Sequence, residues 1–204
     1  MLKIYGTRTS SNVQKVLWCC GELGLAFERI EIGPAFGGNR TFGYLALNPN
    51  GLMPTIDDDG FLLWESNVIV RFLAAKHASG TLCPTDLAQR ADCERWMDWQ
   101  QTSIVPHMGV AFRALLKQPP DATPAEQVRT AVEKAGAMWT ILDAHLAKRA
   151  FVGGPALTIG DIALGNAIHR WFKLPVERPE LSRLKAWYGR LCERPAYQQH
   201  IADV

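Results

Sequence analysis

Residues 51–66, GLMPTIDDDGFLLWES, decide how the first part of this chain folds. The residue before a proline is pushed into an extended conformation, and the bond before a proline can be cis at modest cost, so we predict a cis Met53–Pro54 bond. Met53 can then offer its backbone N–H and C=O to an extended peptide. The acidic turn at Asp57–Gly60 reverses the chain into a second strand, and Glu65–Ser66 stands where a helical pattern begins.

The Glu65–Ser66 pair has the chemistry of a site for an amino-acid head group. A serine at a helix start, with free backbone N–H groups behind it, suits a carboxylate, and the neighbouring glutamate suits an ammonium. Each motif alone is usually an ordinary turn or cap, but their order along the chain is more specific than its parts. The unit therefore predicts a glutathione-shaped site, whose binding residues are Leu52, Met53, Pro54, Glu65 and Ser66.

With these motifs, the chain resembles the cytosolic glutathione S-transferase family, in particular bacterial members with a theta- or nu-like serine-type N-terminal site. The resemblance extends over nearly the whole length. It implies a detoxification enzyme that conjugates the glutathione thiolate to small hydrophobic electrophiles. Glutathione would be a co-substrate, with no tightly bound cofactor and no metal, and the family precedent implies a two-fold homodimer.

The chain divides by composition into two parts. Residues 1–78 alternate strand-like and helical segments, residues 79–85 form a linker with Gly, Ser and Pro, and residues 86–204 are almost purely helical. We predict an N-terminal thioredoxin-like α/β domain, in the order βαβ then ββα, followed by an all-α C-terminal helical bundle domain. Strands are expected at residues 2–5, 27–32, 55–56 and 61–63. Helices are expected at residues 12–23, 66–77, 87–116 with a break near Pro106, 124–146, 161–172 and 181–190.

The polar run at the end of the first strand supplies candidate catalytic donors. A free thiol near pKa 8.5 is only a few per cent ionised at neutral pH, and donors at a helix N-terminus can stabilise its thiolate. Counted back from Lys15, Ser10 matches the serine of theta-like enzymes, and Asn12 matches the asparagine that assists in a bacterial group. Ser11 is a close competitor. The alternative is that all three serve only as helix caps.

Leu52 departs from the pattern of many relatives, which carry Lys or Gln at this position. The side-chain contact to the glycyl carboxylate of glutathione would then have to come from Asn39, Arg40 or solvent. If neither of these side chains replaced the contact, the affinity for glutathione would be reduced.

The second substrate is expected over the helix at residues 95–103. Candidate lining residues are Trp96, Trp99, Ser103 and His107, the last because a histidine beside Pro106 could polarise an electrophile. Helical spacing alone produces such an aromatic stripe, so most of these aromatic side chains are expected in the core. The TIGD stretch at 158–161 indicates a helix-capping box, which makes Asp161 a cap rather than a catalytic acid.

Composition and charge exclude several classes of partner and reaction. A net charge of +2 with scattered basic residues indicates no nucleic-acid partner, and no apolar run approaches the length that crosses a membrane. The five cysteines are an odd number without metal-ligand spacing, which favours a reduced, cytoplasmic location. No cysteine lies near Ser10, which argues against mixed-disulfide chemistry. Other glutathione-dependent reactions (isomerisation, dehalogenation, peroxide reduction) and a non-catalytic binding protein on the same fold remain as alternatives.

Overall fold

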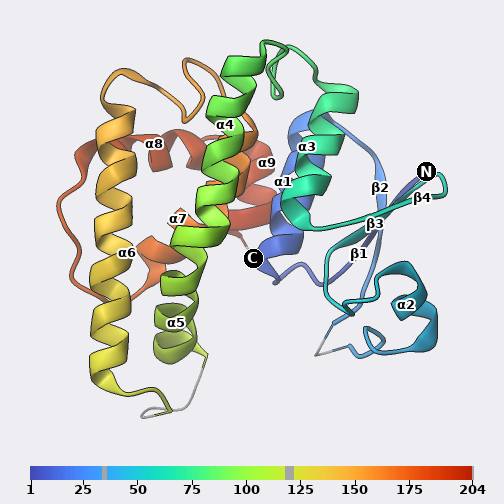
Figure 1. The fold of residues 1–204 in the computed structure, drawn as a ribbon, viewed down its shortest axis with the longest axis horizontal. Helices are drawn as coiled ribbons and strands as arrows, with labels where there is room; N and C mark the ends of the chain where they lie inside the picture. Colours follow the sequence, from blue (N-terminus) through green and yellow to red (C-terminus); the bar gives the residue numbers. More distant parts are fainter. Residues whose placement is uncertain (34–35, 118–121, 204) are drawn as a thin grey trace. The chain divides into compact units, whose positions relative to one another are not determined.

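The computed structural model describes residues 1–33, 36–117 and 122–203. Its contacts divide the chain into two compact units, Met1–Cys83 with Arg194–Val204, and Pro84–Glu193 (Figure 1). The sequence analysis assigned the whole of 86–204 to the helical domain. The contacts instead group the segment from Arg194 onward with the first unit, because it packs on a helix of that unit.

The first unit is built on a mixed sheet of four strands in the order β2-β1-β3-β4. β1 (Leu2–Tyr5) and β2 (Phe27–Ile30) are parallel and are joined through helix α1 (Ser11–Leu23), as a parallel pair requires a crossover. β3 (Thr55–Asp58) runs antiparallel to β1. β4 (Phe61–Trp64) runs antiparallel to β3 and forms the edge of the sheet.

The acidic turn between β3 and β4 is a two-residue hairpin loop. Asp59 and Gly60 have φ angles of 53° and 94°, and positive φ at both central residues matches the right-handed twist of the flanking strands. The Asp57 carboxylate accepts a 2.7 Å hydrogen bond from the Gly60 N–H. This turn fixes the register that brings Trp64 opposite Thr55, and so places Glu65 and Ser66 beside the start of β3.

Helix α3 (Ser66–His77) begins and ends at the residues expected from the sequence. It packs on α1, and both helices lie on the same side of the sheet (Figure 1). Their shared core includes the fully buried side chains of Ile4, Val16, Ile56, Ile69 and Leu73. A short helix, α2 (Phe42–Leu47), was not predicted, because six residues are too few to show a helical period.

The segment after Arg194 covers α1. It forms the short helix α9 (Pro195–Tyr197) and the π-helix η3 (Gln198–Ala202). The Tyr197 ring packs edge-on against Trp18 with 4.8 Å between ring centroids. Arg194 Nε donates a 2.8 Å hydrogen bond to the Glu22 carboxylate. A Cβ atom on Gly21 would stand 2.9 Å from the Ala196 Cβ, so the close approach of this segment requires glycine there.

The second unit is helical. Its elements are α4 (Leu87–Trp99), the π-helix η1 (Gln100–Ile104), α5 (Val105–Leu116), α6 (Ala125–His145), the 3-10 helix η2 (Leu146–Lys148), α7 (Ile159–Lys173) and α8 (Ser182–Cys192). The break expected near Pro106 is the π-helical turn, which ends just before it. Proline has no N–H to continue the α-helical ladder, and the Val105 N–H bonds instead to the Gln100 carbonyl.

Asp161 is a structural cap, as predicted. Its buried carboxylate accepts hydrogen bonds of 2.8 Å each from the N–H groups of Val152 and Thr158 and from Trp187 Nε1, and one of 3.0 Å from the Thr158 hydroxyl. Burial raises the pKa of Asp161, although these donors act in the opposite direction. The carboxylate thereby ties the start of α7 to the preceding loop and to α8.

The observed architecture confirms the predicted fold class, an α/β unit with a small mixed sheet and an all-helical unit. Within the described residues, no helix combines the length and apolar character needed to cross a membrane. The same residues contain no group of three or more His, Cys, Asp or Glu side chains that could hold a metal ion.

Candidate functional site

A cavity of about 100 Å³ opens in the first unit, where the segment before β3 meets the first turns of α1 and α3. Its lining residues are Asn12, Asn48, Asn50, Leu52, Met53, Pro54, Glu65 and Ser66. All five binding residues expected from the sequence are therefore brought together, and one of the three candidate donors lies with them.

The Met53–Pro54 peptide bond is cis, as predicted. The carbonyl oxygen of Leu52, just before it, is held by two buried side chains. The Tyr44 hydroxyl donates to it at 2.6 Å and the Asn48 amide at 2.9 Å. Both side chains also contact the Thr55 hydroxyl, at 2.9 and 3.2 Å, so they join the two ends of the Leu52–Pro54 segment.

Glu65 and Ser66 also line the cavity. Glu65 precedes α3 with a φ of 74°, a conformation that is uncommon for a residue other than glycine and that clusters at functional sites. Its side chain makes no capping hydrogen bond to the helix. Ser66 is only 2% exposed, and its Oγ has no hydrogen-bond partner. A buried hydroxyl without a partner, at the positive end of a helix, is arranged for an anionic ligand.

The candidate donors occupy the start of α1. Ser10 is the N-cap residue, but its side chain makes no capping hydrogen bond. The alternative interpretation, in which the Ser10 hydroxyl serves only to cap the helix, is therefore not supported by a hydrogen bond. Ser11 is the first helical residue. Asn12 alone of the three lines the cavity. Which of them contacts a bound sulfur remains a prediction.

Asn39 and Arg40, the suggested substitutes for a side chain at position 52, support the loop before the cavity. The Asn39 amide donates a 3.0 Å hydrogen bond to the Gly51 carbonyl, and Arg40 lies 3.5 Å from the Asn50 carbonyl. Neither lines the cavity. The Leu52 side chain is largely exposed.

The two cysteines of α1 do not have the environment of reactive thiols. Cys19 and Cys20 are buried in α1, and burial raises the pKa of both thiols, that of Cys20 to about 12. A thiol with a raised pKa is a poor nucleophile, because the thiolate is the reactive form.

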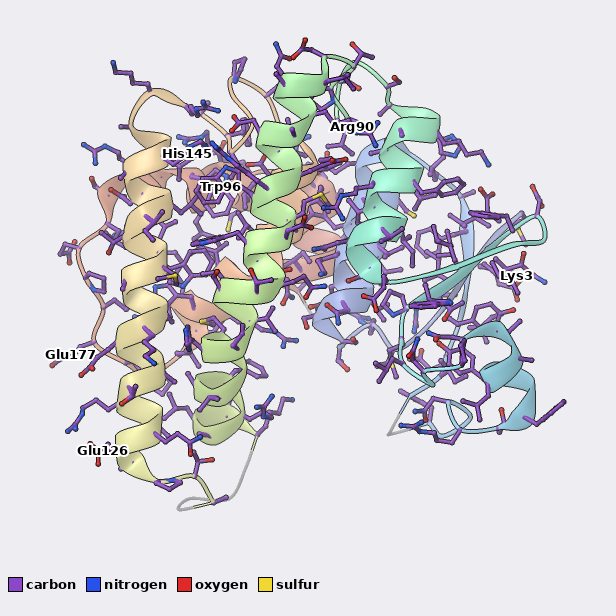
Figure 2. The ribbon with its side chains drawn as sticks, viewed as in Figure 1. Lys3, Arg90, Trp96, Glu126, His145 and Glu177 are labelled. Atoms are coloured by element: carbon purple, nitrogen blue, oxygen red, sulfur yellow. The ribbon has the colours of Figure 1, made fainter. Side chains whose placement is uncertain are left out.

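Of the residues expected to line a second-substrate site, Trp96 and Trp99 contact each other. The Trp96 side chain lies beside His145 between α4 and α6 (Figure 2), with 4.5 Å between ring centroids, and it is buried. Trp99 packs edge-on against Trp96 at 5.0 Å. Ser103 lies in the π-helical turn. His107 lines a separate cleft between α5 and α6, together with Gln127 and Lys134. Trp96 therefore belongs to the core of the helical unit.

Sequence reasoning missed Tyr44, Asn48 and Asn50. Tyr44 and Asn48 shape the loop that carries Met53, and Asn48 and Asn50 line the cavity. Asn48 lies seven residues before Thr55, and only the fold of α2 brings it back to that strand. An asparagine in a loop-like stretch carries no signal of this role.

Models of the glutathione S-transferase N-terminal and C-terminal domains match residues 9–76 and 125–190. Over 204 aligned residues the chain is 38% identical to the Glutathione S-transferase GstB of Escherichia coli K12, with 98% of each chain covered. The chain belongs to the glutathione S-transferase family. A solved theta-class glutathione S-transferase from Xanthomonas axonopodis pv. citri, with glutathione bound, is 44% identical with a TM-score of 0.93, covering 98% of this chain and 96% of that one. Glutathione S-transferase 3 of Zea mays is 31% identical and covers 100% of this chain and 94% of its own.

These relatives confirm the resemblance found in the sequence and the prediction that the protein is an enzyme of the glutathione S-transferase class. The cavity is lined by Met53 and Pro54 and by Ser66, whose buried hydroxyl has no hydrogen-bond partner.

Proposed function

We propose that this glutathione S-transferase conjugates the thiolate of glutathione to small hydrophobic electrophiles, and that it binds glutathione in the cavity between Met53 and Ser66. The observation that carries the proposal is the buried Ser66 hydroxyl without a partner. A carboxylate would satisfy this hydroxyl and the uncapped first turn of α3, while the Glu65 carboxylate would pair with the neighbouring ammonium. Met53 would hold the peptide part through its backbone.

The thiol of the bound peptide would lie toward the start of α1. Lowering a thiol pKa by about two units corresponds to nearly 3 kcal/mol of preferential thiolate stabilisation. A hydroxyl or amide donor among Ser10, Ser11 and Asn12, assisted by the positive end of the α1 dipole, would supply it. The thiolate then attacks the electrophilic carbon, and the leaving group departs with the electron pair of the broken bond.

Two measurements on the same preparation test the proposal. The wild-type protein should be retained on immobilised glutathione and eluted by free glutathione, and it should conjugate glutathione to chlorodinitrobenzene. Ser66→Ala should lose retention while staying folded. Retention without conjugation, over a panel of aryl halides and epoxides, would favour the non-catalytic alternative. Isomerase, dehalogenase or peroxidase turnover in place of conjugation would keep the site and change the reaction. Failure of both measurements would overturn the proposal.

We also propose that the protein is a homodimer. The edge strand β4 and the first turn of α3 expose several apolar side chains, and exposed apolar surface of this kind commonly marks an interface. Phe61 is 51% exposed, Trp64 39% and Val68 42%. Sedimentation velocity should give twice the mass of one chain, and Trp64→Glu should shift the protein toward the monomer. A wild-type monomer at micromolar concentration would contradict this proposal.

We also propose that the protein is located in the reducing cytoplasm. Its support is that the five cysteines are an odd number without metal-ligand spacing, and that four of them are buried. Fractionation of cells that express the protein from its own promoter would test the location, and recovery outside the cytoplasm would contradict it.

A further inference from the structure

Lys15 is a buried charge that the proposed mechanism does not use. It lies in α1, is only 1% exposed, and is among the largest fully buried side chains of the protein. Its Nζ donates a 2.9 Å hydrogen bond to the Asn67 side-chain oxygen. Burying an ammonium costs several kcal/mol unless hydrogen bonds or opposite charges compensate. An apolar residue would fill the same space without that cost.

The partner of Lys15 belongs to the first turn of α3. Asn67 directly follows Glu65 and Ser66, the residues that form one wall of the cavity. The hydrogen bond therefore connects α1 to the turn that presents the unpartnered Ser66 hydroxyl. It also brings a positive charge to the helix end where an anionic group is expected to bind.

The charge state of Lys15 is open to change near neutral pH. Burial lowers the pKa of Lys15 to about 7, with the Glu65 carboxylate raising it and the Arg71 guanidinium lowering it further. The segment that covers the other part of α1 contributes Arg194 and His200. These lie against Glu22 and Gly21, about two turns further along the helix. The ionisable groups that act on Lys15 are therefore Glu65 and Arg71.

We propose that Lys15 is a positioning residue for the head-group carboxylate of glutathione. In its charged form it holds Asn67, fixes the first turn of α3, and supplies the positive charge that complements a carboxylate at Ser66. The inference rests on the proposed function of the cavity. Glutathione binding is then coupled to protonation of Lys15, because a carboxylate placed beside Lys15 stabilises its ammonium form.

The sign of the pH dependence follows from this coupling. The bound state holds the proton of Lys15 to a higher pH than the free state. Binding therefore takes up a proton above about pH 7, and affinity falls as the pH rises through the free-state pKa. We expect the Kd to weaken roughly three- to ten-fold between about pH 6.5 and about pH 8.5.

S-Methylglutathione is the appropriate probe, because its sulfur carries no ionisable proton. Calorimetric titration of the wild-type protein near pH 7.5, in two buffers of different ionisation enthalpy, should report net proton uptake. Lys15→Met should bind more weakly, by roughly ten-fold below pH 7, with a flat pH profile and no proton uptake. Lys15→Arg, whose guanidinium stays charged throughout, should bind with a flat profile at near wild-type affinity.

Lys76→Met is a matched control. Lys76 lies in the last turn of α3, the helix that begins at Ser66, and pairs with Asp58 at 2.6 Å. This variant should keep both the wild-type Kd and its pH dependence. If Lys15→Met and Lys76→Met lost affinity equally, the effect would come from the lower net positive charge of the protein, and the proposal would be overturned.

The outcomes separate this inference from the proposed function. Wild-type binding without proton uptake, or with an unchanged Kd and pH slope in Lys15→Met, overturns the role of Lys15 and leaves the cavity assignment intact. No binding of S-methylglutathione by the wild type, together with no conjugation, overturns the cavity assignment itself. If Lys15→Met does not fold, the wild-type protein alone tests the proposal: proton uptake on binding supports the role of Lys15, and its absence overturns that role.

Discussion

The Tyr44 hydroxyl donates a 2.6 Å hydrogen bond to the Leu52 carbonyl oxygen, and so connects helix α2 to the segment that presents Met53. Its single proton is used in this bond, so the contact with Thr55 at 2.9 Å must be donated by the threonine. Desolvation raises the pKa of Tyr44, which keeps the donor protonated.

Tyr44→Phe should lower the free energy of unfolding by about 1–2 kcal/mol and weaken glutathione binding several-fold. The Asn48 amide still holds the Leu52 carbonyl in this variant, so the loop is loosened rather than lost. Chemical denaturation and calorimetry measure the two effects. Tyr5→Phe, on a ring 6.1 Å away, is the control and should change neither. Unchanged affinity in Tyr44→Phe would mean that the loop keeps its position without the hydroxyl.

Ser66→Ala should separate binding from stability. The Ser66 hydroxyl has no partner in the free protein, so its removal should change the unfolding free energy little. Glutathione binding should weaken by roughly 1–3 kcal/mol, because a charge-assisted hydrogen bond to the carboxylate is lost. Calorimetry on folded protein provides the measurement, with the exposed Ser79→Ala as control. Full affinity in Ser66→Ala would remove this residue from the site.

Ser10→Ala should slow conjugation by roughly ten- to a thousand-fold, the usual cost of losing one preorganised donor. The ultraviolet absorbance of the bound thiolate should shift to higher pH, and glutathione affinity should change much less. Ser11→Ala and Asn12→Ala are measured in parallel. Loss of rate in Asn12→Ala alone would identify the amide that lines the cavity as the donor. Full activity in all three variants would assign the thiolate to the backbone N–H groups of α1.

Asp161→Ala should lower the unfolding free energy by about 3–5 kcal/mol without any direct effect on the cavity. The substitution leaves the N–H groups of Val152, Thr158 and Trp187 buried without their acceptor. Denaturant titration gives the value. Glu133→Ala, which removes an exposed carboxylate of the same unit, should change stability by less than about 0.5 kcal/mol. A loss in Asp161→Ala as small as this would contradict the structural role.

Stability should fall in mild acid. Burial lowers the pKa of His169 to about 4, with Lys173 and Arg170 acting in the same direction, and its Nδ1 lies 2.9 Å from the Tyr188 hydroxyl. The unfolded chain binds a proton at His169 near pH 6.5, whereas the folded protein binds it only near pH 4. The stability that neutral His169 contributes to the folded state is therefore fully present above about pH 6.5. It is lost as the pH falls toward 4, by at most about 1.4 kcal/mol per pH unit.

His169→Gln should reduce this acid slope and leave stability near pH 8 almost unchanged. Denaturant titrations near pH 8, 6.5 and 5 give the slope. Burial also lowers the pKa values of His145 and His200, so part of the wild-type slope should remain in the variant. An identical slope in His169→Gln and wild type would assign acid sensitivity to other groups.

The sequence was sufficient for the features that local rules govern. The order of the four strands, the cis Met53–Pro54 bond, the bounds of α3 and the cap at Asp161 follow from proline chemistry, turn residues and helical period. The same rules brought the five residues of the proposed glutathione site to one cavity, since they lie on one continuous hairpin and the helix after it.

The features that the sequence did not predict depend on contacts between distant residues. Tyr44 and Asn48 gain their role only because α2 folds back on the start of β3. A lysine at helical spacing predicts a solvated side chain, whereas Lys15 is buried because α3 packs over it. Trp96 lies in the core of the helical unit, since a periodic aromatic stripe does not reveal which face meets a substrate.

The return of residues 194–203 to α1 constrains the order in which the protein can be made. The ribosome delivers the thioredoxin-like unit first, but the side chains that cover Trp18 and pair with Glu22 are added only after the whole helical unit has been synthesised. One face of α1 in the nascent first unit therefore stays uncovered while the ribosome synthesises the helical unit. A nonsense mutation at Arg194 would leave every residue of the helical unit in place and would remove the cover of α1 from the first unit.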